Sequence, residues 1–579
     1  MAISTSISIQ IAGEKLTRFS KLVIHQKVHT HHKFSLLQPI PKEFVEQSLE
    51  KAQSYMGQPI KIEIESNNLR ADAPMIFYGV VTESQLVRTS GAAGGIIING
   101  YSPSIVMETV PNIVSFSKQT FSTIINKIAS KYSQKEVQPK VTLKNDSILS
   151  YTVQYGESDF GFLCRMAKKK GEWFYYNGEE TFFGKPATSK TINLEYGRNL
   201  HSFNIEMRVK AFGFEYVGYD PSSAETNLAN STEINYQPQG FSKPAFDASK
   251  RLFPGTSTLL YSNAIEEGNS RSHLLDRVQK QVESRAADLV TAKGESDETG
   301  IRVGDIITIQ QTTFSLTGNV EDGLKEQNYG SYLVTDITHY CDETGSYHNT
   351  FDAVPADVLA PPYGNVHSVP LAETQPAIVV DNNDPKGLSR IQVQFPWQTP
   401  TGDNTPWIRV TTPYAGKGKG FHVLPEIGEE VLVDFEGGNA EKPVVIGTMF
   451  HGAGKSGHGG SGNFMKGFQT ATGNRLQMDD NKGSIYLSDQ GTANMLFDGA
   501  GNATTNANAT NTINVGKGDG SVMKMDSDGN ITLDGKTSLT ITIGSSKLEM
   551  KEDGTITFNG KILLLMVKIS KQLVKQVST

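Results

Sequence analysis

The stretch RLQMDDNKGSIYLS, residues 475–488, contains the pattern that decides the fold of the C-terminal part of this chain. Leu, Met and Ile alternate with polar residues on both sides of a turn that contains Gly483. The arrangement returns in SVMKMDSDGNITLD (521–534) and in SKLEMKEDGTITFN (546–559). Because successive side chains of a strand point to opposite faces, each copy predicts two short strands with one apolar face.

The predicted apolar face has nothing in its own chain to cover it, because the segment of about 110 residues contains only short strands. Three copies wound about one axis would turn these faces inward, and hydrogen bonds between copies would protect the strand edges. We therefore expect a trimeric, intertwined β-helix or prism, which we call the needle. Its predicted core residues are Leu476, Met478, Ile485, Leu487, Met523, Met525, Ile531, Leu533, Leu539, Ile541, Ile543, Leu548, Met550, Ile556 and Phe558.

Three other structures fit part of this pattern. They are a single-chain parallel β-helix, a monomeric β-sandwich and a low-complexity tail, the last suggested by NATTNANATNTIN at 502–514. A single-chain β-helix requires longer and more regular coils, and a disordered tail would lack the alternating Leu, Met and Ile. The intertwined oligomer is therefore the favoured interpretation. A light-scattering mass equal to one subunit would exclude it.

Composition divides the rest of the chain into segments. Pro355, Pro361 and Pro362 indicate a linker before a compact β unit of the size of an OB barrel, and a Gly/Ser-rich stretch follows that unit. The last residues, KILLLMVKISKQLVKQVST, break the repeat. The predicted segments are a hub of β barrels and helices (1–370), an OB-fold domain (371–450), a linker (451–466), the needle (467–560) and a tip or tail (561–579).

The N-terminal segment has strand patterns with a few helical ones. Residues 21–36 alternate apolar residues with His and Lys, which predicts a half-buried strand or strand pair. Helical spacing predicts packing helices at 121–132 and 271–293. The Asn177-Gly178 pair between aromatic runs predicts a hairpin. The expected fold class is therefore mainly β with minor α.

Composition restricts the classes of partner and of compartment. The 579 residues carry a net charge of -7, which disfavours nucleic acid as the main partner. The N-terminus lacks a signal peptide pattern, and no run approaches the roughly 18 apolar residues of a membrane span. Two cysteines, Cys164 and Cys341, favour free buried thiols in a reducing compartment. We expect assembly in the cytoplasm, no stable membrane insertion, and export by another machine.

Three histidines are candidate metal ligands. His25, His29 and His31 lie on one face of the predicted strand, but Lys27 and Lys33 on the same face would repel a divalent cation. A solvated face is therefore the favoured interpretation, and no metal or cofactor site is predicted.

Catalytic motifs receive no positive support. Glu157, Asp159 and Glu172 could form an acid/base pair, yet their position beside Arg165 favours structural ion pairs or subunit contacts. GAGKS at 452–456 lacks the first glycine and the strand-loop-helix context of a phosphate loop. We therefore expect no enzymatic activity.

Several motifs resemble one family. YTVQYGESDFGFLCRMAKKKGEWFYY (151–176) is similar to its hub signature, and GLSRIQVQFPWQ (387–398), WIRVTTPYAGKGKG (407–420) and LPEIGEEVLVDFEGGNAEKPVVIG (424–447) follow its OB motifs. This is the VgrG family, the spike proteins of type VI secretion, which are similar to the hub and spike of contractile phage tails. The signature residues are Tyr155, Glu157, Ser158, Asp159, Phe160 and Arg165; the OB motif residues are Phe395, Pro396, Trp397, Trp407, Pro425, Gly428 and Glu430. We expect Trp397 and Trp407 to be core anchors of the OB-fold domain.

The resemblance implies a non-enzymatic, homotrimeric puncturing spike that delivers effectors across a target envelope. Its implied partners are a hexameric Hcp-type tube, a PAAR-type tip protein, baseplate components and effector proteins. It also implies secretion into the extracellular space or a target cell. Two alternatives are a baseplate spike of a contractile phage or phage-derived particle, and a spike that carries cell-wall hydrolase activity.

Overall fold

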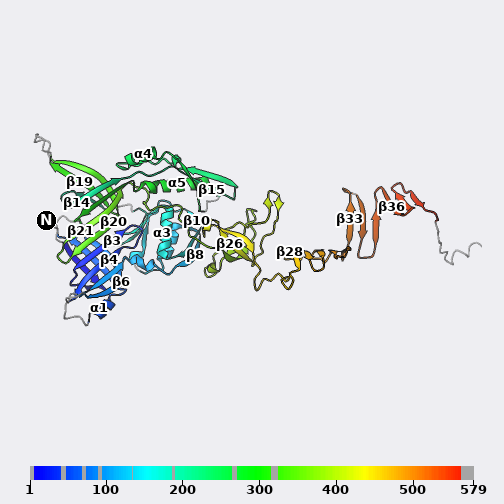
Figure 1. Cartoon of the computed structure of the whole chain (residues 1–579), viewed down its shortest axis with the longest axis horizontal. Helices are drawn as coiled ribbons and strands as arrows, with labels where there is room; N and C mark the ends of the chain where they lie inside the picture. The colour runs from blue at the N-terminus through cyan, green and yellow to red at the C-terminus, as the bar shows by residue number, and fades with distance from the viewer. Residues whose placement is uncertain are drawn as a thin grey trace, which may run out of the picture. The chain divides into compact units, whose positions relative to one another are not determined.

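The computed structural model describes residues 5–40, 47–67, 74–88, 94–133, 135–185, 190–263, 270–314, 324–518 and 520–562. Two compact units make up the chain, residues 1–449 and residues 450–579 (Figure 1). Strands dominate both units, and the described α-helices belong to the first. The predicted mainly β class with minor α is therefore confirmed. The tail predicted at 561–579 lies outside the described residues from position 563 onward.

Thirteen of the described strands form one sheet in the order β14-β18-β21-β20-β3-β4-β7-β6-β5-β1-β2, with β13 paired to β19 and β19 paired to β20. The antiparallel pairing of β20 with β3 joins strands that lie far apart in the sequence. The bounds are β1 Thr5–Ile11, β2 Glu14–Lys15, β3 Lys21–Lys27, β4 Lys33–Ile40, β5 Pro59–Ser66, β6 Met75–Arg88, β7 Gly94–Tyr101, β13 Thr191–Glu195, β14 Leu200–Met207, β18 Val290–Ser296, β19 Ile306–Phe314, β20 Leu324–Asp342 and β21 Tyr347–Pro355.

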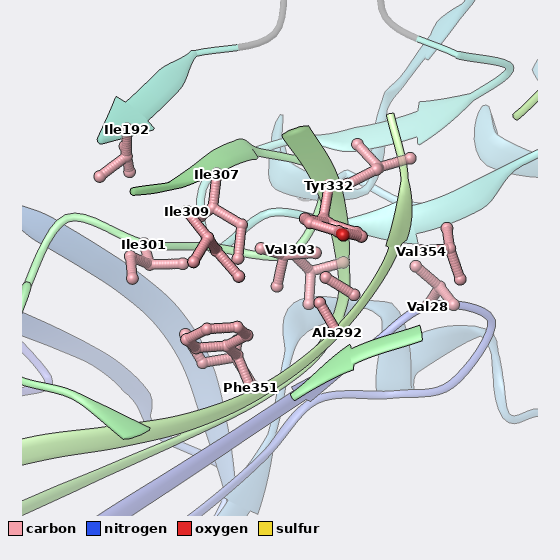
Figure 2. Close-up of a cluster of buried hydrophobic side chains, with 14 of the residues drawn as sticks. Val28, Ile192, Ala292, Ile301, Val303, Ile307, Ile309, Tyr332, Phe351 and Val354 are labelled. Carbon is pink, nitrogen blue, oxygen red and sulfur yellow. The ribbon is translucent and has the colours of Figure 1, made fainter. Parts of the chain in front are cut away.

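Two hydrophobic cores form on this sheet. In the first, Ile307, Tyr332 and Phe351 come together from β19, β20 and β21, as Figure 2 shows. The second core contains Leu22 and Phe77, and Ala52 of helix α1 (Ser48–Ser54) packs into it. Strand β3 alternates buried and more exposed residues, as the sequence pattern predicts for a half-buried strand.

A third core lies among residues 103–185 and surrounds the segment that resembles the hub signature. The aromatic hairpin predicted around Asn177-Gly178 is confirmed as β11 paired with β12. The helix predicted at 121–132 ends three residues early, at Ala129. The elements are η2 Pro103–Met107, β8 Asn112–Thr120, α2 Phe121–Ala129, η3 Lys135–Val137, β9 Pro139–Val141, β10 Ile148–Glu157, α3 Asp159–Lys170, β11 Phe174–Tyr176 and β12 Thr181–Phe183.

The fourth core joins a three-stranded sheet to two helices, and here one helix prediction was wrong. The helix predicted at 271–293 ends at Ala286, and Leu289 lies in the connection to β18. The next residues pair with both β14 and β21, so sheet pairing overrides the helical periodicity. The elements are β15 Phe214–Asp220, β16 Glu225–Asn230, η4 Ser231–Glu233, α4 Ser242–Leu252, β17 Ser257–Leu260 and α5 Ser270–Ala286.

A separate small barrel-like sheet follows, and we call it the OB region. Its four strands run in the order β23-β22-β26-β27, around a core that contains Phe395, Val431 and Val433. Its elements are β22 Gln375–Asp381, β23 Gln392–Gln394, η5 Pro396–Gln398, β24 Ala415–Gly416, β25 Lys419–Gly420, β26 Glu430–Phe435, η6 Glu436–Gly438 and β27 Pro443–Thr448.

The described part of the second unit is a chain of antiparallel meanders of five, three and three strands. Each of the three repeats forms the predicted strand pair, and Gly483, Gly529 and Gly554 hold positive φ angles of 65°, 82° and 83° in the turns. The strands are β28 Met465–Gln469, β29 Arg475–Asp479, β30 Ser484–Ser488, β31 Asn494–Phe497, β32 Ala503–Asn506, β33 Asn511–Val515, β34 Ser521–Met525, β35 Ile531–Asp534, β36 Ser538–Ile543, β37 Ser546–Lys551 and β38 Ile556–Asn559.

The two cysteines are both free and buried, as predicted. Within the described ranges, none of the helices combines the length and the apolar character that crossing a membrane requires.

Candidate functional site

The segment similar to the hub signature folds as strand β10 followed directly by helix α3. Ser158 caps this helix, because its hydroxyl accepts a hydrogen bond from the Gly161 N–H at 3.0 Å. Gly171 ends it in the left-handed region, with φ at 65°. Phe160 and Phe162 both belong to the third core. The signature therefore encodes a helix with both of its ends defined locally.

Charged residues of the signature form ion pairs within this fold. Arg165 Nε lies 2.8 Å from Glu157 Oε1, and Arg165 Nη2 donates a hydrogen bond to the Val153 carbonyl at 2.6 Å. The Arg165 and Glu157 side chains are 8% and 20% exposed, so the pair is largely removed from water. This arrangement holds α3 against β10.

Asp159 anchors the start of α3 to β10 and to the segment that follows helix α2. Its carboxylate accepts hydrogen bonds from Lys131 at 2.8 Å, Tyr132 at 2.7 Å and Gln154 at 3.0 Å. Burial by itself would raise the pKa of Asp159, but these hydrogen bonds outweigh burial and hold the pKa below its ordinary value. Asp159 is thus an ionised structural anchor.

Glu441 of the OB region enters the same charged group. Its side chain is 2% exposed and pairs with Lys169, while Arg165 Nη1 lies 3.8 Å away. The Val153 N–H also donates to Glu441 Oε1 at 3.4 Å. Burial lowers the pKa of Lys169, and the Glu441 carboxylate offsets part of that effect. A buried ion-pair network therefore fastens α3 to the OB region, and we call it the junction.

Polar and aromatic contacts extend the junction on the side of the OB motif. Trp397 donates from Nε1 to Gln375 Oε1 at 2.8 Å, and Gln375 Nε2 donates to the Tyr155 hydroxyl at 3.1 Å. Gln398 donates to Ser115 at 2.9 Å. Trp397 also stacks on Phe395, with ring centroids 5.2 Å apart. The signature residue Tyr155 and the OB motif residue Trp397 are brought together, although 242 positions separate them in the chain.

The remaining OB motif residues shape turns and the core. Phe395 is fully buried, Pro396 begins the short helix η5, and Pro425 is buried. Gly428 has a φ of 92° in the turn before Glu430, which is the first residue of β26.

Trp407 was predicted as a core anchor of the OB region, and this prediction was wrong. Its side chain is half-buried and does not belong to the core cluster, whereas the neighbouring Ile408 is buried. Adjacent residues of an extended segment face opposite sides, so Ile408 occupies the core and turns Trp407 away.

The candidate histidines do not share a solvated face, so that prediction was also wrong for two of them. Strand β3 ends at Lys27, and His29 turns the chain with a φ of 66°. His29 Nε2 lies 2.7 Å from the Cys164 carbonyl, and the His31 ring stacks on Phe160 at 3.6 Å. Burial lowers the pKa of each of these two histidines to about 4.

His25 alone remains on the strand, where it is 2.9 Å from Asp336. Within the described ranges, no group of three His, Cys, Asp or Glu side chains has metal-site geometry. The buried histidines instead attach the turn after β3 to helix α3.

The needle residues form a second candidate site, an apolar ladder across the strands. Leu476 lies opposite Leu487, Met523 opposite Leu533, and Ile541 opposite Leu548. Most of the predicted core side chains are exposed in the single chain; Leu539, Leu548 and Met550 are half-buried. In β29 and β30, the polar residues that alternate with the apolar ones are less exposed than the apolar residues themselves. The ladder is thus an uncovered apolar face.

The sequence interpretation missed helix α3 and the OB partners Glu441, Gln375 and Gln398. A signal for α3 was present, because Ser158 stands before a helically spaced apolar run that ends at Gly171. No local signal marks Glu441, since its partners lie far away in the sequence.

Comparison with known proteins adds independent findings. A family model described as the phage tail baseplate hub (GPD) matches residues 45–345, and one described as the type VI secretion system/phage-baseplate injector OB domain matches residues 375–450. The chain is 26% identical over 332 residues to the type VI secretion system spike protein VgrG5 of Pseudomonas aeruginosa, which covers 52% of this chain and 40% of that protein.

A second relative is the actin cross-linking toxin VgrG1 of Vibrio cholerae, 23% identical over 58% of this chain and 31% of that protein. The chain therefore spans less than half the length of these two relatives. Among solved structures, the lidded Francisella PdpA-VgrG complex matches with a TM-score of 0.52 and 8% identity, over 92% of this chain and 80% of that one. This likeness concerns the fold alone.

Proposed function

The chain belongs to the VgrG family, which shares the phage tail baseplate hub fold, and from this premise we propose that it is a non-enzymatic, homotrimeric puncturing spike of a contractile type VI secretion tube. The observation that carries the proposal is the uncovered apolar ladder of the needle. Side chains such as Ile531 and Ile543 are 69% and 78% exposed in one chain. A protein that left this face in water would aggregate.

A threefold assembly covers the ladder. Each apolar side chain that moves from water into a core contributes roughly 1.5 to 3 kcal/mol, and the predicted core has over a dozen in each subunit. The short meanders have open edges, which neighbouring copies can pair or shield. In a closed ring of three copies, every copy has the same environment, and no apolar face stays exposed to water. The needle would then unfold only with the dissociation of all three chains.

Rigidity is the proposed mechanism. Force applied to the hub must pass through the OB region before it reaches the needle. In each subunit, the buried group of Glu441, Lys169 and Arg165 resists sliding, because separating it would strand charges away from water. The aromatic contact of Tyr155 with Trp397 supports the same interface.

Partners follow from the family as proposals. The broad end would dock on a hexameric Hcp-type tube and baseplate components, and the needle tip would carry a PAAR-type protein and effectors. The spike would assemble in the cytoplasm and leave the cell when a sheath contracts. The Vibrio relative is named an actin cross-linking toxin, but this chain matches only 31% of that protein. Absence of catalysis in this chain is therefore part of the proposal.

The test is the mass of the purified full-length protein by light scattering. We expect three times the subunit mass of 63.2 kDa. Ile541→Asp places a carboxylate in the ladder and should reduce the mass, whereas Thr542→Asp on the next residue of β36, on the opposite face, should leave the mass unchanged. A single-subunit mass for the unaltered protein would contradict the proposal. Equal effects of the two variants would show that the ladder is not the interface.

A baseplate spike of a phage or phage-derived particle remains the second candidate, because the OB family description covers both kinds of machine. Deletion of the gene distinguishes them. Loss of Hcp-type tube protein from the culture medium, without particles in electron micrographs, supports secretion; loss of contractile particles supports the second candidate.

A further inference from the structure

A cavity of about 270 Å3 lies between β10, the end of α3 and the first half of α5. Figure 1 labels these three elements. Its lining includes Lys170, Arg277, Tyr151 and Thr152, together with Lys169 of the junction. The volume is below the roughly 300 Å3 at which pockets for drug-sized ligands begin, so it suits a small ligand.

Lys170 is the unusual residue of this cavity. It is only 6% exposed, and no hydrogen bond or ion pair engages its ammonium among the residues that the structure describes. Lys169, the preceding residue, has a side chain that is 13% exposed and pairs with Glu441. A buried ammonium without a partner is costly, and proteins normally pair such a charge or coordinate it. Among the described residues, no carboxylate is paired with Lys170 at ion-pair distance, whereas Glu441 is paired with Lys169.

Arg277 adds a second unused donor. The residue is 8% exposed; its Nη2 is 3.3 Å from Asp276 and its Nη1 donates to the Lys169 carbonyl at 3.5 Å. Its Nε is buried and has no hydrogen-bond partner within the described ranges. A guanidinium with a free Nε–H can still bind one oxyanion oxygen.

We propose that this cavity binds a compact tetrahedral oxyanion, phosphate in the cell, which the Lys170 ammonium and the Arg277 Nε–H hold together. The charged residues of the cavity lining are Lys169, Lys170, Arg277, Asp276 and Glu441. One bound anion would give both unused donors an acceptor. The site would tie the end of α3 to α5, next to the junction.

The state of Lys170 makes binding depend on pH. Burial lowers its pKa to about 7, and the neighbouring charges of Arg277 and Lys169 add to this effect. Carboxylates oppose it: Asp276 of α5 and Asp146 of the segment before β10. Glu172, which follows α3, also interacts with Lys170. His273 of α5 lines the same cavity, and burial together with the charges of Arg277, Lys170 and Lys169 lowers its pKa to about 3, so it stays neutral near pH 7. Because only the protonated ammonium attracts an anion, affinity should fall as pH rises through about 7.

Isothermal titration calorimetry of the full-length protein with sodium sulfate tests the proposal. Sulfate keeps the same charge near neutral pH, so any pH dependence comes from the protein. We expect one site per subunit, and Lys170→Met should weaken binding on the order of tenfold or more, since it removes a charge-assisted hydrogen bond. Affinity of the unaltered protein should be lower at pH 8.5 than at pH 6.

Two further variants separate binding from folding. Lys168→Met changes a lysine of the same helical turn that does not line the cavity, and it should leave affinity unchanged. Lys170→Arg keeps a charge that does not titrate, so sulfate binding should persist at pH 8.5.

Absence of sulfate binding to the unaltered protein would overturn the proposal, as would equal affinity in Lys170→Met. A lower assembly mass of Lys170→Met in light scattering, with no sulfate binding to the unaltered protein, would indicate that a carboxylate of another chain fills the cavity. That result would also overturn the proposal, while leaving the spike function untouched.

Discussion

The large sheet of the first unit and the needle of the second use the same alternating pattern with opposite results. In β3, Leu22 and Ile24 are fully buried because another layer of the same chain covers them. In β36, apolar and polar residues alternate in the same way, but Ile541 and Ile543 are 46% and 78% exposed. Alternation therefore specifies an apolar face. Whether a single chain buries that face depends on whether another layer of the same chain covers it.

Low pH should produce the largest difference in stability between the two units. His29 and His31 are half-buried in the first unit, and their pKa values are lowered to about 4, while residues 464–562 contain no histidine. Unfolding exposes the rings and restores their ordinary pKa near 6.5, so the unfolded state binds more protons as pH falls from 6.5 towards 4. The stability of the first unit, complete above pH 6.5, should therefore fall, by about 2 kcal/mol per histidine at pH 5.

Differential scanning calorimetry at pH 7 and pH 5 measures this difference. The transition of the first unit should shift to lower temperature, and that of the needle should stay nearly constant. His31→Gln should flatten the pH dependence of the first transition. A needle transition that shifts equally would refute the assignment to buried histidines.

Breaking the ion pairs of the junction should cause the next largest loss of stability. Glu441→Gln removes a carboxylate that is 2% exposed and leaves the buried Lys169 ammonium without its counter-charge. We expect the free energy of unfolding of the first unit to fall by about 3 to 5 kcal/mol, measured by urea denaturation. Glu436→Gln is the matched control, because its partners Arg409 and Lys442 are half-exposed and such pairs contribute about 1 kcal/mol or less. Equal losses in the two variants would contradict a buried network.

The smallest expected effect concerns the N-terminal cap of helix α3. Ser158→Ala removes the side-chain oxygen that caps α3 and should reduce the stability of the first unit by about 1 kcal/mol. Ser158→Asp retains a capping oxygen and should keep most of that stability. Urea denaturation measures both variants, and unchanged stability in Ser158→Ala would assign the serine another role. Neither variant should alter the needle transition.

Local patterns carried much of the prediction. The three strand pairs of the needle, the aromatic hairpin and the mainly β class could be predicted because each depends on residues that are close in sequence. The domain boundaries, the trimer and the partners remain predictions. The failures have local causes as well: the strand pattern was extended past the turn at His29, and the helix pattern past Ala286.

Local sequence alone specifies which faces of the strands are apolar and where glycine turns the chain. Tertiary structure decided which polar residues are buried together. Lys169 and Glu441 lie 272 positions apart, and nothing in the neighbourhood of either residue specifies the other. Side-chain periodicity reports only the direction in which a residue points relative to its neighbours in sequence. What it meets there depends on how distant segments pack, and that is settled when the whole chain folds.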